Sequence, residues 1–184
     1  MIEAVFVDRD GTIGGGKGVL YPDEFRLFSY VKQTIQRIKE AGITVCSFTN
    51  QPGISKGEVK KEQYNEELCR FGFDKVYLCP HTNEEGCQCR KPGTGMLLQA
   101  AEENNFSLKR CVVVGDRWTD MLAAQRAGCR KILIQTGAGR EALTGYLQRE
   151  YVGEWAAVTL DHIASNFKEA AAWLLDRQKM EDGT

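Results

Sequence analysis

The chain has 184 residues, of which 42% are hydrophobic and 27% are charged, and this suffices to close one ordinary core. Its 24 Lys and Arg residues against 25 Asp and Glu residues give a formal net charge of −1, which argues against nucleic acid or an acidic membrane surface as a partner. No apolar run approaches the roughly 18 residues of a membrane span, and no export signal opens the sequence. We therefore expect a monomeric, cytoplasmic protein.

Short β-branched runs alternate with helical patterns along the chain, which predicts an α/β fold with a doubly wound parallel sheet. The predicted strands cover residues 4–7, 43–48, 75–78, 111–114 and 131–134. The first predicted helix repeats Val31, Ile35 and Ile38 at helical spacing, and the second opens with a capping box at Ser55 and Glu58. Further helices are predicted over residues 96–104, 120–127, 140–150 and 161–175. We expect one domain over residues 1–178 and a frayed tail over residues 179–184.

Carboxylates follow the ends of the predicted strands. Asp8 and Asp10 end the first strand two residues apart, so an extended backbone presents both side chains to one small volume. Thr49-Asn50-Gln51 ends the second strand, and Asp116 follows the fourth, with Asp120 one helical turn later. Because ligands bind at the carboxyl ends of parallel strands, these groups should converge there. Converging carboxylates repel one another unless a hard cation lies between them, which predicts Mg²⁺.

Two other metal or phosphate motifs are weighed against this site. A calcium-binding loop fails because position twelve, counted from Asp8 or from Asp10, falls on Val19 or Tyr21, where a Glu is required. The glycine-rich segment 11–18 comes close to a P-loop, but it ends in Gly18 where a Ser or Thr must bind Mg²⁺. We therefore predict that this segment is a flexible loop that lies next to a bound phosphate group.

The sequence contains seven cysteines, an odd number in a chain that shows no export signal, so metal binding is favoured over disulfides. Cys79, His81, Cys87 and Cys89 place four soft ligands within eleven residues. Three Cys and one His make a closed tetrahedral site with no open position for water. We predict that these four residues bind one structural Zn²⁺.

Four segments in order resemble the motifs of haloacid dehalogenase-type phosphatases: Asp8-Arg9-Asp10-Gly11-Thr12, Thr49-Asn50-Gln51, Lys91-Pro92 and Gly115-Asp116. The Cys-Pro-His and Cys-x-Cys-Arg-Lys-Pro segments are similar to the subgroup that contains D,D-heptose 1,7-bisphosphate phosphatases and the histidinol-phosphate phosphatase domain. The resemblance covers about residues 4–137 and implies a Rossmann-like fold. The segments between the motifs are too short for a separate cap domain.

The resemblance implies a role for each matching residue. Asp8 is expected to be the nucleophile that forms an aspartyl-phosphate, and Asp10 to protonate the leaving alcohol and then activate water. Thr49 and Lys91 are expected to hold the phosphoryl oxygens. Asp8, Asp116 and the backbone carbonyl of Asp10 are expected to bind Mg²⁺.

The substrate is less closely defined than the reaction. The segment 14–18, Gly-Gly-Gly-Lys-Gly, departs from the acidic and aromatic loop expected in the heptose enzymes, and the longer Pro-rich stretch of the histidinol enzymes is missing. Candidate substrate-binding residues are Asn50, Arg90, Arg117 and Lys17, and a cationic rim favours a second anionic group, as in a sugar bisphosphate. The alternatives are histidinol phosphate hydrolysis, a phosphotransferase, and a catalytically silent zinc module that binds a phosphorylated ligand.

Overall fold

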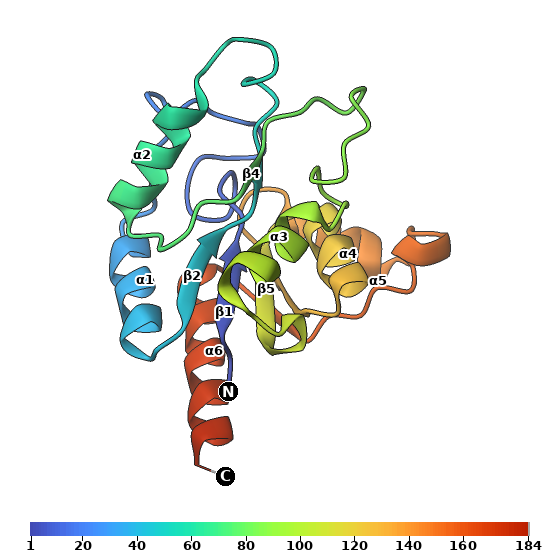
Figure 1. Ribbon diagram of the computed structural model, residues 1–184. Coiled ribbons are helices and arrows are strands. Elements are labelled where there is room, and N and C mark those ends of the chain that lie inside the picture. The colour runs from blue at the N-terminus through green and yellow to red at the C-terminus, as the bar shows by residue number, and fades with distance from the viewer. Residues whose placement is uncertain (184) are drawn as a thin grey trace.

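A parallel five-stranded sheet lies between two layers of helices in the computed structural model, which describes residues 1–183 (Figure 1). The strand order is β2-β1-β5-β6-β7, so β1 is flanked by the next strand on one side and by a much later strand on the other. A second small parallel sheet pairs β3 with β4. The strands are β1 (Ala4–Val7), β2 (Thr44–Ser47), β3 (Thr49–Asn50), β4 (Leu78–Cys79), β5 (Cys111–Gly115), β6 (Arg130–Ile134) and β7 (His162–Ala164). The predicted α/β class with a parallel sheet is confirmed.

Alternate residues of the central strands build two cores. Val5 and Val7 of β1 face the layer that contains α1, α2 and α6, whereas Phe6 faces the layer that contains α3, α4 and α5. Because successive strand residues point to opposite faces, a strand buried on both sides reads as one continuous apolar run. The helices are α1 (Val31–Glu40), α2 (Lys61–Phe71), α3 (Gly95–Asn104), α4 (Trp118–Ala127), α5 (Gly139–Leu147) and α6 (Phe167–Asp182), with 3₁₀ turns η1 (Leu108–Arg110) and η2 (Gly153–Trp155).

The predicted start of the second helix at Ser55 is wrong. Residues 52–58 form turns and a bend, and α2 begins at Lys61. The start of α2 is capped by Gln63, whose Oε1 accepts a hydrogen bond from the backbone N–H of Lys60 at 3.0 Å. Both residues of the expected capping box bind other loops. Ser55 donates to Glu85 Oε2 at 2.7 Å, and Glu58 accepts from the Tyr21 hydroxyl. The two residues of the predicted capping box therefore form hydrogen bonds between loops and do not cap a helix.

The predicted helix over residues 161–175 is split by a strand that the sequence analysis missed. His162–Ala164 pairs with β6 as the edge strand β7, and Asp161 exchanges two hydrogen bonds with the backbone of Lys131 at 2.8 and 3.0 Å. Asn166 then caps α6 by accepting from the N–H of Glu169 at 3.1 Å.

The end of the chain, for which we predict a frayed tail over residues 179–184, includes the last turn of α6. Residues 179–182 belong to α6, and Thr184 lies outside the described residues. Glu181 pairs with the N-terminal amine at 2.5 Å and with Arg130 at 2.7 Å. Gln178 accepts from the N–H of Ile2 at 2.7 Å. The last helix is thus tied to the beginning of the chain.

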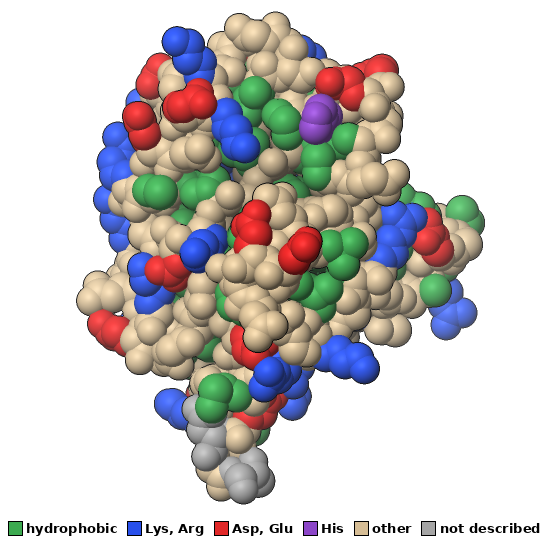
Figure 2. All heavy atoms as spheres, in the orientation of Figure 1, with side chains coloured by type: hydrophobic (Ala, Val, Ile, Leu, Met, Phe, Trp, Pro, Cys, Tyr) green, Lys and Arg blue, Asp and Glu red, His purple; other side chains and the backbone are tan. Residues whose placement is uncertain are grey.

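The two termini lie at one end of the sheet, and the long connections after β1, β3 and β4 lie at the other end, above the carboxyl ends of the strands (Figure 1). Positive and negative side chains are interspersed over most of the face in Figure 2, with a group of Lys and Arg side chains along the edge beside α1 and α2. Within residues 1–183, no helix is long and apolar enough to cross a membrane.

Candidate active site

Three carboxylates meet where β1 and β5 end. Oxygen atoms of Asp8, Asp116 and Asp120 all lie within 4.8 Å of one another, and the three residues are no more than 4% exposed. Asp8 and Asp116 directly follow β1 and β5, whereas Asp120 lies in the first turn of α4 and accepts from the N–H of Arg117 at 3.0 Å. The adjacent strands therefore set the spacing of the cluster.

The cluster needs positive charge. Burial, together with the negative charges of Asp8 and Asp120, raises the pKa of Asp116 to about 8, and burial raises that of Asp120 to about 6 although Lys91 opposes the change. Glycine backbone packs closely around Asp116, since a Cβ on Gly11 or Gly137 would come within 2.2 Å of its Oδ2. An all-oxygen donor set of this kind fits Mg²⁺.

Lys91 is the cation that contacts the cluster directly. Its Nζ lies 2.8 Å from Asp8 Oδ1, 2.6 Å from Asp120 Oδ1 and 2.8 Å from the carbonyl oxygen of Phe48. Burial disfavours the charged ammonium, but Asp120 and Asp8 outweigh it and raise the pKa of Lys91. The lysine is therefore charged and fixed between two carboxylates.

Asn50 positions the backbone of this lysine. Its Oδ1 accepts from the N–H of Lys91 at 3.1 Å, and its Nδ2 lies 3.5 Å from the Lys91 carbonyl oxygen. Asn50 also lines the cavity above the site. The residue that we predicted to bind substrate thus also connects β3 to the loop that carries Lys91.

The Asp10 carboxylate lies outside the three-carboxylate cluster. Gln51 Nε2 donates to Asp10 Oδ2 at 2.7 Å and to Thr49 Oγ1 at 2.9 Å. Burial raises the pKa of Asp10, and the charge of Arg9 opposes this increase. Of Asp10, only the backbone carbonyl enters our expected Mg²⁺ site, and its carboxylate lines the cavity above the site.

A cavity of about 400 Å³ opens above these groups. Its walls include Asp8, Asp10, Thr49 and Lys91, together with the predicted residues Asn50, Arg90 and Arg117. Six further lining residues are not among the predicted site residues, and of these Pro92 alone belongs to a motif: Val19, Pro52, Asn83, Pro92, Thr119 and Trp155. Trp155 follows α5 and is held by a hydrogen bond of 2.9 Å from Trp118 Nε1 to its carbonyl.

The three predicted cationic rim residues lie in different places. Arg90 lines the cavity and donates to the carbonyl of His81 at 3.1 Å. Arg117 also lines it, and its guanidinium donates to the carbonyl of Lys17. The Lys17 side chain instead pairs with the exposed Glu141 at 2.7 Å and is not among the lining residues. Its predicted contact with substrate therefore gains no support from the geometry.

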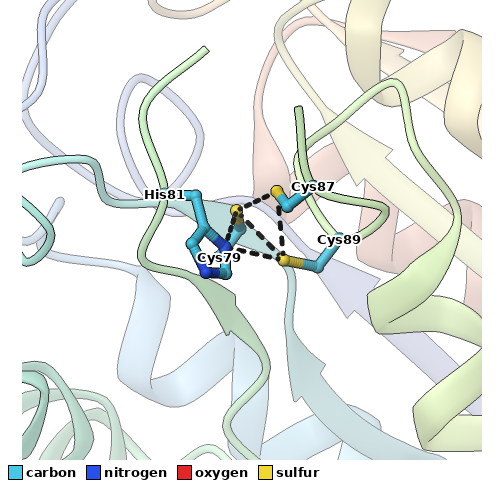
Figure 3. Close-up of side chains that lie close together, drawn as sticks. All are labelled: Cys79, His81, Cys87 and Cys89. Atoms are coloured by element: carbon cyan, nitrogen blue, oxygen red, sulfur yellow. Dashed lines mark hydrogen bonds between the residues drawn. The ribbon is translucent and has the colours of Figure 1, made fainter. Parts of the chain in front are cut away.

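The four residues of the predicted cysteine cluster lie together (Figure 3), and Arg90, next to Cys89 in the sequence, lines the cavity. Cys79, His81, Cys87 and Cys89 bring one ligand atom each within 4.8 Å of the others. Five contacts between these atoms measure 3.2 to 3.6 Å. Burial acts to raise the pKa of Cys87, but hydrogen bonds from the Arg90 N–H and neighbouring groups lower it to about 7, which favours a thiolate. This group can hold a metal ion.

Comparison with known proteins places the chain in one family. The family model described as haloacid dehalogenase-like hydrolase matches residues 16–128, and a second, HAD-hydrolase-like model matches residues 88–170. The chain belongs to this family. Its relatives include heptose bisphosphate phosphatases, and the chain is a phosphatase of the Mg²⁺-dependent kind found in this family.

Within the family, the chain is similar to heptose 1,7-bisphosphate phosphatases. The D-glycero-D-manno-heptose-1,7-bisphosphate 7-phosphatase of Thermosynechococcus vestitus is 33% identical over 192 residues, covering 93% of this chain and 94% of the relative. The corresponding D-glycero-beta-D-manno enzyme of Yersinia pestis is 36% identical over 154 residues, covering 74% and 82%. The crystal structure of D,D-heptose 1,7-bisphosphate phosphatase from B. bronchiseptica, complexed with magnesium and phosphate, superposes with a TM-score of 0.80 at 30% identity, covering 96% and 99%.

We predict that Lys91→Met lowers the free energy of unfolding of the metal-free protein by about 3 to 5 kcal/mol, because it leaves two buried carboxylates without their cation. Urea unfolding with a chelator present measures this loss. Added Mg²⁺ should reduce it, since a bound cation stabilises the native state. Lys109→Met, at an exposed position, is the control, and an unchanged unfolding midpoint for Lys91→Met would contradict the prediction.

Proposed function

We propose that this phosphatase hydrolyses a phosphomonoester through a covalent intermediate on Asp8. The supporting observation is that the Asp8 carboxylate lines the cavity together with Asp10, Thr49 and Lys91. A buried nucleophile, a second carboxylate and two groups that bind phosphoryl oxygens thus face one space. The charge of Lys91 offsets the repulsion between an anionic nucleophile and an anionic phosphate.

In the first step, an Asp8 oxygen forms a bond to phosphorus while the bond from phosphorus to the leaving oxygen breaks. The protonated Asp10 carboxyl gives its proton to that oxygen, so an alcohol leaves. In the second step, Asp10 takes a proton from water as the water oxygen attacks phosphorus. The bond to Asp8 breaks, phosphate is released, and both carboxyls return to their starting forms. Thr49 Oγ1 and Lys91 Nζ hold the phosphoryl oxygens throughout.

Asp8, Asp116 and the backbone carbonyl of Asp10 would hold Mg²⁺. When bound, the ion supplies the charge that stabilises the phosphoryl group during transfer. Asp120 completes the carboxylate cluster, but its 2.6 Å contact with Lys91 Nζ supports a role in orienting the lysine. Thr12 has a corresponding role toward Asp116, because its hydroxyl donates to Asp116 Oδ1 at 3.4 Å.

Zn²⁺ is the proposed occupant of the cysteine cluster. Ligand atoms about 2.1 to 2.3 Å from a tetrahedral ion are separated from one another by roughly 3.4 to 3.8 Å. The distances of 3.2 to 3.6 Å between the four ligand atoms are close to these values. The last ligand, Cys89, immediately precedes Arg90 and Lys91. We therefore infer that Zn²⁺ stabilises the loop that delivers both residues to the site.

The substrate that we propose is a sugar bisphosphate of the heptose 1,7-bisphosphate kind. The names of the relatives support this choice. The cavity supports it as well, because Arg90 and Arg117 line it and offer guanidinium groups to a second phosphate. We propose that residues 1–178 act as a single domain without a cap, so these loops alone contact the leaving group. The corresponding proposal is a monomeric, cytoplasmic enzyme of carbohydrate metabolism, and the free cysteines of the chain are consistent with a reducing compartment.

We predict that Asp8→Asn abolishes phosphate release while the fold is retained, because the amide has the shape of the carboxylate but is not a nucleophile. Asp10→Asn should lower the rate by roughly 10² to 10⁴, about 3 to 5 kcal/mol of barrier, since it removes one proton-transfer group. A screen of phosphorylated metabolites with Mg²⁺, measuring inorganic phosphate, tests both variants. Near-normal turnover by Asp8→Asn would refute the mechanism, and circular dichroism confirms folding.

One zinc ion per chain is expected by elemental analysis of protein purified without chelator. Cys87→Ser should lower the zinc content and the phosphatase activity together, because a loosened loop misplaces Lys91. Cys69→Ser is the matched control, since Cys69 is exposed on α2, outside the cluster. Protein that contains no zinc and has full activity would show the proposal to be wrong.

Arg90→Ala and Arg117→Ala should each lower kcat/KM for heptose 1,7-bisphosphate by about 10- to 100-fold, mainly through KM, because each removes a charge-assisted hydrogen bond of roughly 1.5 to 3 kcal/mol. The effect on a small monophosphate should be much smaller. Arg37→Ala, on an exposed position of α1, serves as control. Equal kcat/KM for heptose bisphosphate and an aryl phosphate in the unmodified enzyme, or a preference for histidinol phosphate, would overturn the substrate assignment.

A further inference from the structure

Arg9, between the two carboxylates of the first motif, is fully buried. Its side chain is 0% exposed. The guanidinium carbon lies 3.7 Å from the centroid of the Phe25 ring and 5.0 Å from that of Tyr64. An arginine is almost never fully buried unless its charge is paired. The partners of this guanidinium therefore indicate why the residue is there.

Glu67, on α2, fixes the plane of the guanidinium. Arg9 Nε donates to Glu67 Oε2 at 2.7 Å, and Nη2 donates to Oε1 at 3.0 Å. Glu67 is itself 1% exposed. Such a two-point contact leaves little freedom of rotation, so it determines where the remaining nitrogen, Nη1, points.

Nη1 points at Asp10. It donates to Asp10 Oδ1 at 2.8 Å and to the carbonyl of Leu20 at 2.8 Å. The N–H of Leu20 donates back to the same Asp10 oxygen at 3.1 Å. With Gln51 on Oδ2, each oxygen of the Asp10 carboxylate has at least one fixed donor, and the end of the glycine-rich loop is part of the same network.

We propose that Arg9, held by Glu67, is a positioning residue that orients the Asp10 carboxyl for proton transfer. The proposal rests on the proposed function, in which Asp10 gives its proton to the leaving oxygen and then takes one from water. Arg9 is not among the residues that line the cavity, so it acts only through Asp10. A misplacement of about 1 Å can lower the rate of a proton-transfer step by roughly 10²-fold.

Arg9→Lys tests the geometry, because lysine keeps the charge but cannot bind Glu67 at two points while reaching Asp10. We expect kcat to fall at least tenfold and KM to change less than twofold. Glu67→Gln is the second variant, which retains an acceptor for Arg9 and should lower kcat by a smaller factor. Both are measured as inorganic phosphate release below the temperature at which unfolding begins.

The Asp10→Asn background separates positioning from a general effect on folding. If Arg9 acts through Asp10, then Arg9→Lys should lower kcat no further once Asp10 is Asn. Asp161→Asn is the control for the loss of a charge pair elsewhere, since Asp161 lies 3.5 Å from Lys131 at the opposite end of the sheet. This variant should leave kcat unchanged.

The outcomes distinguish the inference from the proposed function. If Asp10→Asn lowers kcat but Arg9→Lys lowers it by the same factor in both backgrounds, Arg9 is structural only and the inference is wrong. An unchanged kcat for both Arg9→Lys and Glu67→Gln also overturns it. If Asp10→Asn itself leaves kcat unchanged, the acid-base role of Asp10 fails, and the positioning role of Arg9 fails with it.

Discussion

The ammonium of Lys91, set between Asp8 and Asp120, is the contact on which the rest of the site depends. Adjacent parallel strands bring carboxylates together at their carboxyl ends without help, but the same geometry makes those charges repel one another. The required cation arrives from a loop 83 residues after Asp8 in the sequence. The sheet topology therefore produces repulsion between the carboxylates. The loop that carries Lys91 must be held rigidly enough for the ammonium to offset that repulsion.

That loop is anchored on each side of Lys91. Before Lys91, the last residue of the cysteine cluster, Cys89, directly precedes Arg90. The N–H of Arg90 donates to Cys87 Sγ at 3.3 Å. At Lys91 itself, Asn50 binds the backbone. After it, Arg126 of α4 donates to the carbonyl of Pro92 at 2.9 Å and pairs with Glu154 beside Trp155. The cysteine cluster, β3 and α4 thus all contact the segment around Lys91, and Trp118 of α4 also binds the backbone of Trp155, which lines the cavity.

The sequence was sufficient for the parts of the structure that are set by local patterning. Buried strands have the pattern of β-branched runs, and the motifs follow those strands directly, so the sequence alone predicts that Asp8 and Asp116 lie at one edge of the sheet. Features that depend on tertiary contacts were missed. Ser55 and Glu58 have the pattern of a capping box but bind Glu85 and Tyr21, and β7 is too short to show a period of its own. Trp155 lines the cavity and is held there by a hydrogen bond from Trp118, a contact between residues 37 positions apart. Lys17 looked like a rim residue because its loop follows the first motif, yet Glu141 draws its side chain away.

The two buried cations at the site serve different purposes because their partners differ. Arg9 is matched by Glu67, so it orients Asp10 through hydrogen bonds while adding almost no net charge. Lys91 is shared by Asp8 and Asp120 and leaves Asp116 without a direct cation among the contacts of the described residues. Burial accordingly raises the pKa of Asp116 to about 8. A phosphomonoester dianion entering this cavity adds further negative charge, which Lys91 alone cannot balance. A divalent ion that Asp8 and Asp116 would hold at the ends of β1 and β5 would therefore reduce the repulsion within the carboxylate cluster and the repulsion between the cluster and the phosphate.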